Sequence, residues 1–514
     1  MKKFLIVFLI FFLFFPVALF ADEKEEILRK IESLADEIKK LKQQVEEIKT
    51  KETTQEEKIT SQEDKIKEVE KKADKASEIS RFTLSGDYRF RIDSVRAEFP
   101  AQHTYYYPMM GFGSDKSFTA KNDSIMTHRF RLNISAQATE NIGFVGRLAM
   151  YKVAGSQTST SLSSGTDPMF GIFPHNGMLF DGNTGHLATD NVLRVDRAFV
   201  NWMNIGGLPL AFSVGRRPSA GGAPTHLRQN IERDAPPLGL GIDYAFDGLV
   251  VGYFHNKPMS GNLKLCYGRG FESGFKGVSS SKVDDVDFFG FNWEAEESSK
   301  NIFLLLQGFK AFDLMDVPEI QSFVNQTRFS STNVGDLYHL TGLIMHKFNN
   351  IDWFVSGGMS KTDPKAQSAA GFGSLLTDPG DSGLDSKTGY ALYAGLHVPI
   401  PQLKSKFGLE YNYGSKNWVT LTPASDDLIT SKLATRGSVY EAYWIWEIPG
   451  KQISRFAKTF IRIGYQYYDF NYSGSGLWLG EPKKISEINT STEKPLFPAA
   501  ENMQDVYLTF DVYF

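Results

Sequence analysis

The chain has a single cysteine among its 514 residues, and this scarcity excludes intrachain disulfides and cysteine-built metal sites. The nine histidines are scattered without an H-E-x-x-H pair, and the sequence also lacks the G-x-S-x-G, phosphate-loop and dinucleotide motifs. The net charge of −4 is too small to indicate a nucleic-acid partner. We therefore expect no enzyme activity, no cofactor, no metal site and no nucleic-acid binding.

Long apolar runs are confined to the N-terminus. Lys2 and Lys3 precede an apolar run over residues 4–15, Pro16 ends it, and Ala21 is a small residue where cleavage is expected. The run is short for a membrane span of about 20 residues, and an acidic region follows it, so a cleaved secretory signal over residues 1–21 is favoured over a retained anchor. An exported chain without later apolar helices can still enter a bilayer as a closed barrel.

Residues 22–80 form a region with helical periodicity. Apolar residues recur alternately four and three positions apart, which is the heptad pattern of a coiled coil. The seam consists of Ile27, Ile31, Leu34, Ile38, Leu41, Val45, Ile48, Ile59, Ile66, Val69, Ala73 and Ala76. This seam predicts self-association without fixing the number of helices, and a single solvated helix is the alternative. At about 1.5 Å per residue the seam spans roughly 75 Å, which suits a periplasmic stalk that reaches toward peptidoglycan.

From residue 81 the periodicity changes to strict alternation. Within residues 82–93 one face carries apolar and aromatic side chains such as Phe82 and Phe90, while the other carries charges such as Arg89 and Asp93. This arrangement is typical of a membrane barrel wall, apolar toward lipid and polar toward a watery interior. Because the pattern recurs to the last residue, it predicts a transmembrane antiparallel β-barrel of sixteen strands over residues 81–514, with short turns at one end and long loops at the other.

The last strand carries the most specific signal. Its apolar positions end with Phe510, Val512 and Phe514, and the chain stops on this aromatic residue. Such an ending resembles the signal by which the outer-membrane assembly machinery recognises bacterial barrels, and an ordinary closing strand is the alternative. Together with the signal peptide, it predicts a barrel in contact with outer-membrane lipid.

Four sequence motifs follow one another along the chain. They are S-G-D-Y-R-F-R (85–91), R-A-F-V-N-W (197–202), F-S-V-G-R-R-P-S (212–219) and Y-G-R-G-F-E-S-G (267–274). With these motifs the chain resembles a family of Gram-negative outer-membrane porins catalogued as a domain of unknown function. The resemblance implies a barrel and a channel, and it brings no catalytic residue and no known substrate. By analogy with porins we expect a homotrimer, held by the coiled coil and by contacts between barrels.

Strand alternation places many charges inside the predicted barrel, with arginines on the first five strands and acids on the later ones. The predicted pore-lining residues are Asp87, Arg89, Arg91, Arg129, Arg131, Arg147, Arg197, Arg217, Glu410, Glu441, Glu447 and Asp511. Such charges either create a field that sets ion preference or pair with each other and merely hold the wall. Cys266, between Leu265 and Tyr267, is expected to be a small inward-facing filler.

Residues 218–237 follow the fifth strand, where trimeric general porins fold a loop into the channel. Two glycines allow a tight bend near its start, and two prolines stiffen its exit. Its charged and titratable residues are His226, Arg228, Glu232, Arg233 and Asp234. We expect this loop to narrow the lumen opposite the arginine wall, and a surface loop is the alternative.

The leading functional expectation is an outer-membrane porin that lets small hydrophilic or ionic solutes diffuse through an aqueous channel. A barrel of sixteen strands is wide enough for such a channel. The alternative is a structural anchor whose coiled coil tethers the envelope while the barrel stays closed. Electrical conductance distinguishes the two functions.

Overall fold

The computed structural model describes residues 33, 35–46, 81–104, 116–155, 187–188, 191–218, 221–257, 259–275, 283–316, 320–321, 328–329, 331–422, 426–489 and 492–514. The chain divides into two units, Met1–Ser80 and Arg81–Phe514. In the first unit, residues 35–46 are helical, and the seam positions Ile38, Leu41 and Val45 are exposed on this helix. The signal peptide and the rest of the predicted coiled coil lie outside the described residues. Among the described residues, no helix combines the length and the apolar character that a membrane span requires.

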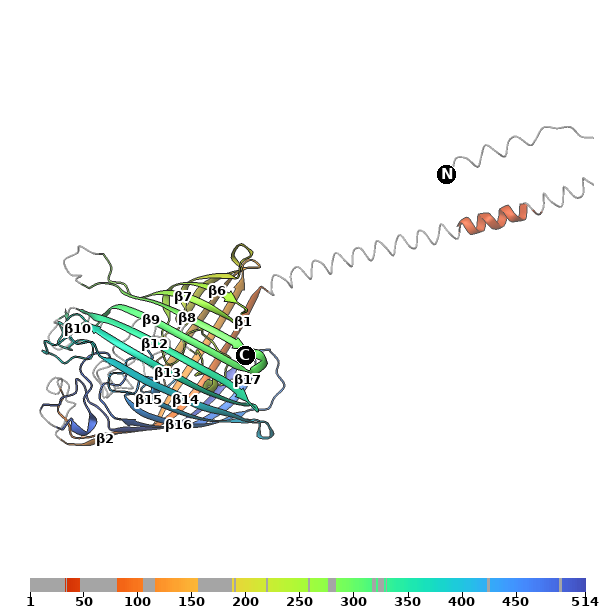
Figure 1. Cartoon of the computed structure of the whole chain (residues 1–514). Helices are drawn as coiled ribbons and strands as arrows, with labels where there is room; N and C mark the ends of the chain where they lie inside the picture. Colours follow the sequence, from red (N-terminus) through yellow and green to blue (C-terminus); the bar gives the residue numbers. More distant parts are fainter. Residues whose placement is uncertain are drawn as a thin grey trace, which may run out of the picture. The chain divides into compact units, whose positions relative to one another are not determined.

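The second unit is a closed antiparallel barrel (Figure 1). Its sixteen strands are β1 (Phe82–Phe99), β2 (Phe118–Gln137), β3 (Ile142–Val153), β4 (Arg194–Met203), β5 (Leu210–Arg217), β6 (Phe246–His255), β7 (Ser260–Phe271), β8 (Val286–Glu297), β9 (Ile302–Met315), β12 (Asn333–Phe348), β13 (Ile351–Pro364), β14 (Thr388–Ile400), β15 (Ser405–Gly414), β16 (Gly437–Glu447), β17 (Lys458–Phe470) and β18 (Asn502–Tyr513). Each strand pairs with the next, and β10 (Ile320–Gln321) and β11 (Arg328–Phe329) form a separate two-stranded sheet. The predicted antiparallel barrel and its count of sixteen strands are confirmed.

The barrel closes where its first and last strands meet. β1 and β18 pair from Asp87 opposite Tyr513 to Glu98 opposite Asn502. Beyond this ladder, Gly86 donates a backbone hydrogen bond to Phe514 at 2.8 Å and accepts one from it at 3.0 Å. The Phe514 ring lies over Gly86, where an added Cβ would approach the ring to 2.7 Å. A glycine at this position therefore lets the terminal aromatic ring cover the seam.

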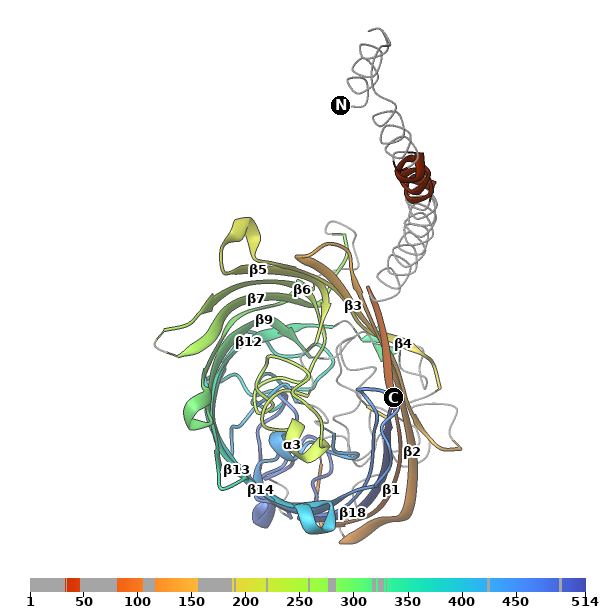
Figure 2. The same cartoon turned by 90° about the vertical axis from the view of Figure 1, so that its right-hand side faces the viewer.

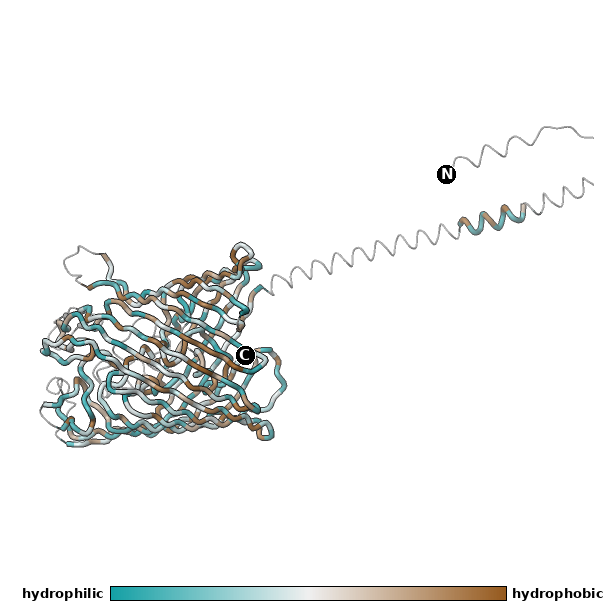
Figure 3. The backbone as a smooth tube through the Cα atoms, viewed as in Figure 1, coloured by the Kyte–Doolittle hydropathy of each residue, from teal (hydrophilic) through white to brown (hydrophobic). Residues whose placement is uncertain are grey.

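The two faces of the wall differ as the alternation predicts. On β17 and β18 the outward side chains of Ile463 and Leu508 are 50% and 43% exposed, whereas the inward Arg462 and Thr509 are completely buried. In Figure 3 apolar stretches recur along the strands of the wall. An outer surface of this composition is stable in contact with lipid, because the backbone groups are paired within the sheet and the side chains that face lipid are apolar.

The two ends of the barrel are unequal. Turns such as residues 138–141 and 349–350 join strands at the end that holds both termini of the barrel, and eight longer connections join them at the other end. Numbered in chain order, loop 3 is residues 218–245, loop 6 is 365–387, loop 7 is 415–436 and loop 8 is 471–501. These four loops pack together through a buried apolar cluster that includes Ile242, Leu375, Leu421 and Trp478. They therefore cover part of the mouth at the long-loop end.

A charge on the outward face should destabilise the barrel. We expect Ile463→Arg to lower the free energy of unfolding by roughly 2–4 kcal/mol, because the guanidinium group must be placed against hydrocarbon near mid-strand. Ile453→Arg is the matched control, since Ile453 is fully exposed in the turn between β16 and β17. Urea unfolding in lipid vesicles, followed by tryptophan fluorescence, measures both. Equal stability of the two variants would contradict the outward orientation of Ile463.

Candidate functional site: the barrel lumen

The twelve predicted pore-lining residues lie on β1–β5, β15, β16 and β18, and all face the interior. Most of them are buried, with Arg89 and Arg91 each 1% exposed. Arg217 lies over the ring of the buried Phe199, and Glu447 pairs with Lys406 at 2.8 Å inside the wall. These twelve side chains therefore share the interior of the barrel.

The arginines on the first four strands are paired with acids. Asp87 accepts hydrogen bonds from Arg129 at 3.2 Å and from Arg131 at 2.7 Å. Arg91 pairs with Asp93 and Asp505, Arg89 with Asp511, and Arg147 with Asp196. These contacts correspond to the expected alternative in which wall charges neutralise each other, and they leave little uncompensated charge on this part of the wall.

Loop 7 supplies an acid that the sequence analysis missed. Asp426 pairs with Arg89, with Arg129 at 3.2 Å and with Arg462 at 3.0 Å. Burial by itself would raise the pKa of Asp426, but the guanidinium groups of Arg89, Arg462 and Arg129 outweigh it and hold this pKa well below its ordinary value. Asp426 therefore stays ionised and fixes loop 7 to the arginine wall. No local pattern indicates this role, because its partners lie more than 30 residues away in the sequence.

Loop 3 crosses the interior of the barrel. Figure 2, which looks along the barrel, shows its short helix α3 (His226–Gln229) inside the ring of strands. Arg233 pairs with Glu294 on β8 at 2.6 Å, and the backbone N–H of Leu238 donates to Gln307 on β9 at 2.7 Å. These contacts attach the exit of the loop to the β8–β9 wall.

Two charged residues in the middle of loop 3 meet walls of opposite charge. Asp234 accepts hydrogen bonds from Arg147 at 2.7 Å and from Arg197 at 2.5 Å. About six residues earlier, Arg228 donates to Asp427 of loop 7 at 2.5 Å and to Glu441 at 3.1 Å. The expectation that the loop stands opposite the arginine wall is therefore wrong, because Asp234 carries the loop into direct contact with that wall.

A second buried group joins loop 7 to the acidic wall. Lys432 donates to both Glu410 and Glu441, and Tyr507 donates to Glu441 at 2.6 Å. The two glutamates are only 5% and 3% exposed, so they are covered by these partners. Like Asp426, Lys432 is a lumenal residue that the alternation of strand residues could not identify, since it lies in a loop.

At the short-turn end the lumen opens into a cavity of about 800 Å³, which we call the vestibule. Most of its lining residues are of polar type, and the lining brings predicted strand residues together with loop 3. The charged residues that line it are Asp87, Arg131, Arg147, Arg197, Glu232, Asp234, Arg455 and Lys458. Arg89, Arg91, Glu410, Glu441 and Asp511 do not line it, and Arg217 lines a separate cavity. The vestibule is therefore the part of the lumen in which these charges meet water.

Neutralising the carboxylate of Asp426 should release loop 7. We expect Asp426→Asn to leave three buried arginines short of a counter-charge, and breaking a buried pair costs roughly 3–5 kcal/mol. Limited trypsin digestion of the folded protein in detergent, with cleavage in loop 7 followed by mass spectrometry, should then proceed at least about tenfold faster. Asp385→Asn, in the exposed part of loop 6, is the matched control. An unchanged rate in Asp426→Asn would show that these pairs do not hold the loop.

The chain is similar to several proteins of known structure and matches one family model. Among solved structures, OprB of Pseudomonas putida is 11% identical over 84% of this chain and 94% of its own, with a TM-score of 0.42. An anion-selective porin from Comamonas acidovorans is 10% identical over 84% and 99%, with a TM-score of 0.41. The outer membrane channel DcaP of Acinetobacter baumannii is 10% identical over 84% and 97%, with a TM-score of 0.40. No match is found among curated proteins. The model of a family described as "Protein of unknown function (DUF3373)" matches residues 119–514, and the chain belongs to this family.

Proposed function

We propose that the protein is an outer-membrane porin through which small hydrophilic or ionic solutes diffuse. The single observation that carries this proposal is a closed barrel with apolar residues outside and, inside, a vestibule of about 800 Å³ lined largely by polar residues. Loop 3 acts as the constriction, because it crosses the bore and is attached to opposite sides of it. The barrel lies in the outer membrane, and the assembly machinery recognises it through Phe510, Val512 and Phe514.

In the same proposal, the N-terminal unit serves to assemble the porin. Residues 22–80 form a periplasmic coiled coil, which together with contacts between barrels holds a homotrimer and reaches peptidoglycan. Exposed Ile38, Leu41 and Val45 on the helix support a self-associating seam, because such a stripe is unfavourable in water.

The vestibule gives the channel a preference for anions. Five basic side chains and three acidic ones line it, so its net charge is positive. A net positive lining raises the local concentration of anions and lowers that of cations.

A second function is favoured by the packing at the opposite mouth. Four outer loops share one apolar cluster there, and Asp426 and Lys432 hold loop 7 inside the barrel against the wall that runs from β15 to β2. If these contacts occlude the barrel, the protein is a structural anchor of the envelope without channel activity.

Conductance separates the two functions. In planar bilayers we expect discrete conductance steps from the intact protein, and a several-fold larger step after deletion of residues 220–231. Deletion of residues 382–385, in an exposed stretch of loop 6, is the control and should leave the step unchanged. Heat-modifiable migration on gels verifies that each barrel is folded. Absence of conductance from both the intact protein and the 220–231 deletion would favour the anchor, and an unchanged step in that deletion would exclude loop 3 as the constriction.

Reversal potentials test the anion preference. In a KCl gradient we expect the reversal potential of the intact channel to indicate anion selectivity, and Arg455→Gln to reduce it, because Arg455 lines the vestibule. Lys451→Gln is the control, since Lys451 is exposed in the same turn but lies outside the lining. If both variants keep the selectivity of the intact channel, the vestibule does not set ion preference.

A further inference from the structure

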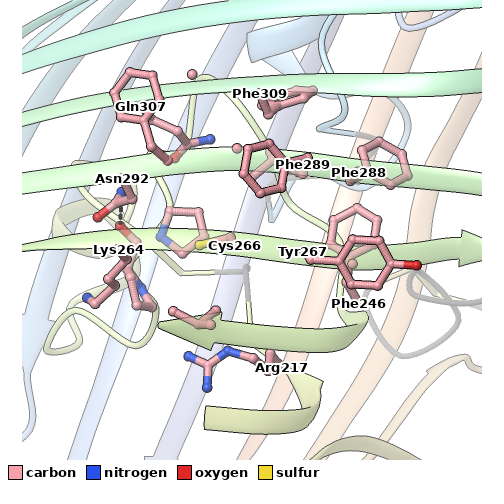
Figure 4. A pocket seen from close by; sticks show the side chains of 18 of the residues that line it. Arg217, Phe246, Lys264, Cys266, Tyr267, Phe288, Phe289, Asn292, Gln307 and Phe309 are labelled. Atoms are coloured by element: carbon pink, nitrogen blue, oxygen red, sulfur yellow. Dashed lines mark hydrogen bonds between the residues drawn. The ribbon is translucent and has the colours of Figure 1, made fainter. Parts of the chain in front are cut away.

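A second cavity lies inside the barrel, against the wall formed by β5–β9. It has a volume of about 110 Å³, and Pro236 and Pro237 of loop 3 border it (Figure 4). None of the described residues lines both this cavity and the vestibule. In Figure 4, Cys266 lies between Lys264 on one side and Phe246 on the other. We call this space, which separates loop 3 from one part of the barrel wall, the side cavity.

Loops 3 and 7 are attached to the other parts of the wall. Asp426 and Lys432 hold loop 7 against the strands from β15 to β2. Leu227 and Leu238 of loop 3 pack in an apolar cluster with side chains of β9, β12, β13 and β14. Asp234 of the same loop pairs with arginines of β3 and β4. Together these contacts cover the wall from β9 round to β4, and the side cavity extends over the strands that they leave, β5–β8.

The inward face of β5–β8 carries small side chains. Two neighbouring rows of directly opposed inward positions are Ser213, Val250, Cys266 and Gly290 in one, and Gly215, Gly248 and Gly268 in the other. The first row continues on β9 and β12 with the larger Phe309 and His339. The wall therefore projects least into the lumen on β5–β8, which leaves space between it and loop 3.

The two ends of the side cavity differ in character. At the end nearer the long loops, the rings of Phe246 and Phe288 lie with their centroids 4.6 Å apart. At the end nearer the short turns, Lys264 and Arg233 of loop 3 donate to Glu294 at 3.1 and 2.6 Å. The side chains of these two cations are 17% and 32% exposed, against 4% for that of Glu294. Water at this end therefore meets two cations and one largely covered carboxylate.

One polar atom in the lining indicates water inside the cavity. Asn292 on β8 donates through Nδ2 to the carbonyl oxygen of Pro236 at 3.2 Å. Its Oδ1 is buried, and no hydrogen-bond partner for it exists among the described residues. Leaving a buried acceptor unpaired is costly, and a water molecule removes this cost by donating a hydrogen bond. Water in the liquid occupies about 30 Å³ per molecule, so the cavity has room for a few such molecules.

We propose that solutes pass loop 3 through the side cavity, between the loop and β5–β8, and that Lys264 and Arg233 favour anions at the end nearer the short turns. This inference rests on the proposed channel function and specifies its path. The side cavity is smaller than the roughly 150 Å³ cavity that holds benzene, so it limits the solutes to small inorganic anions and to uncharged molecules of a few heavy atoms. Two cations beside one carboxylate raise the local concentration of anions.

Cys266 provides a reporter inside the proposed path, because it is the only cysteine of the chain and is only partly buried. Its thiolate attacks the sulfenyl sulfur of sulfonatoethyl methanethiosulfonate, methanesulfinate leaves, and the mixed disulfide places a sulfonate in the side cavity. In planar bilayers we expect the conductance step of the labelled protein to fall at least about twofold and its anion preference to weaken, because the added group takes up space and repels anions. Reduction with dithiothreitol should restore both values.

Two cysteine variants are the controls. Cys266→Ser should show the same step with and without the reagent. Asp385→Cys in the Cys266→Ser background carries the label in the exposed part of loop 6 and should also keep its step. Mass spectrometry verifies the labelling, and heat-modifiable migration verifies folding. An unchanged step after complete labelling of Cys266 would refute the path, and so would a Cys266 that even methyl methanethiosulfonate cannot reach in the folded protein.

Two adjacent residues of β6 give a test without a reagent. Val250 lies directly opposite Cys266 and lines the side cavity, so Val250→Phe should fill the path and lower the conductance step. Leu249→Phe is the matched control, since Leu249 faces outward and is 39% exposed. Equal steps in the two variants would contradict the proposal.

The labelling also separates this inference from the channel function. Absence of conductance from the intact protein would refute both. Discrete steps that survive the labelling of Cys266 unchanged would refute the path through the side cavity and leave the porin intact.

Discussion

Backbone pairing between the first and last strands is the constraint on which the rest of the structure depends. Lipid offers no hydrogen-bond partners, so an open sheet edge in a bilayer costs several kcal/mol for each unpaired group. The β1–β18 ladder and the two bonds between Gly86 and Phe514 remove that edge. Closure also fixes which face of every strand points inward, and its register sets Arg89 directly opposite Asp511 in the lumen.

Barrel closure directs charged side chains into the lumen. The need to pair these buried charges then determines the shape of the bore. Buried guanidinium groups need counter-charges, and the neighbouring strands supply only some of them. Loop 7 contributes Asp426 and loop 3 contributes Asp234 as counter-charges. Arg228 of loop 3 in turn pairs with Asp427 of loop 7. Buried ion pairs add little net stability compared with apolar packing, but removing one partner is costly. The pairs therefore specify where the loops lie more than they stabilise the barrel.

Strand alternation was enough to predict the closed barrel of sixteen strands, because alternation depends on residues that are close in sequence. It could not predict what the inward charges contact. Asp426 and Lys432 lie in a loop without periodicity, and their partners are set by long-range closure of the barrel. For the same reason Arg217 was predicted to face the lumen as one of several arginines, while its lack of a carboxylate partner within the described part of the chain depends on β7, β8 and loop 3. The coiled coil and the trimer stay predictions.

The lumen is asymmetric, and this follows from where loop 3 is attached. Along β1–β4, Asp234 of loop 3 and Asp426 of loop 7 complete the ion pairs of the wall arginines. The charges on this side of the lumen are therefore paired. On β5–β9 the loop turns its prolines toward the wall, and neither proline can compensate a cation. Among the described residues, Arg217 therefore has no carboxylate partner, and it lies over the ring of Phe199. An unpaired cation attracts anions more strongly than a neutralised pair does, so the pairing of the charges, more than their number, sets the electric field on each side of the lumen.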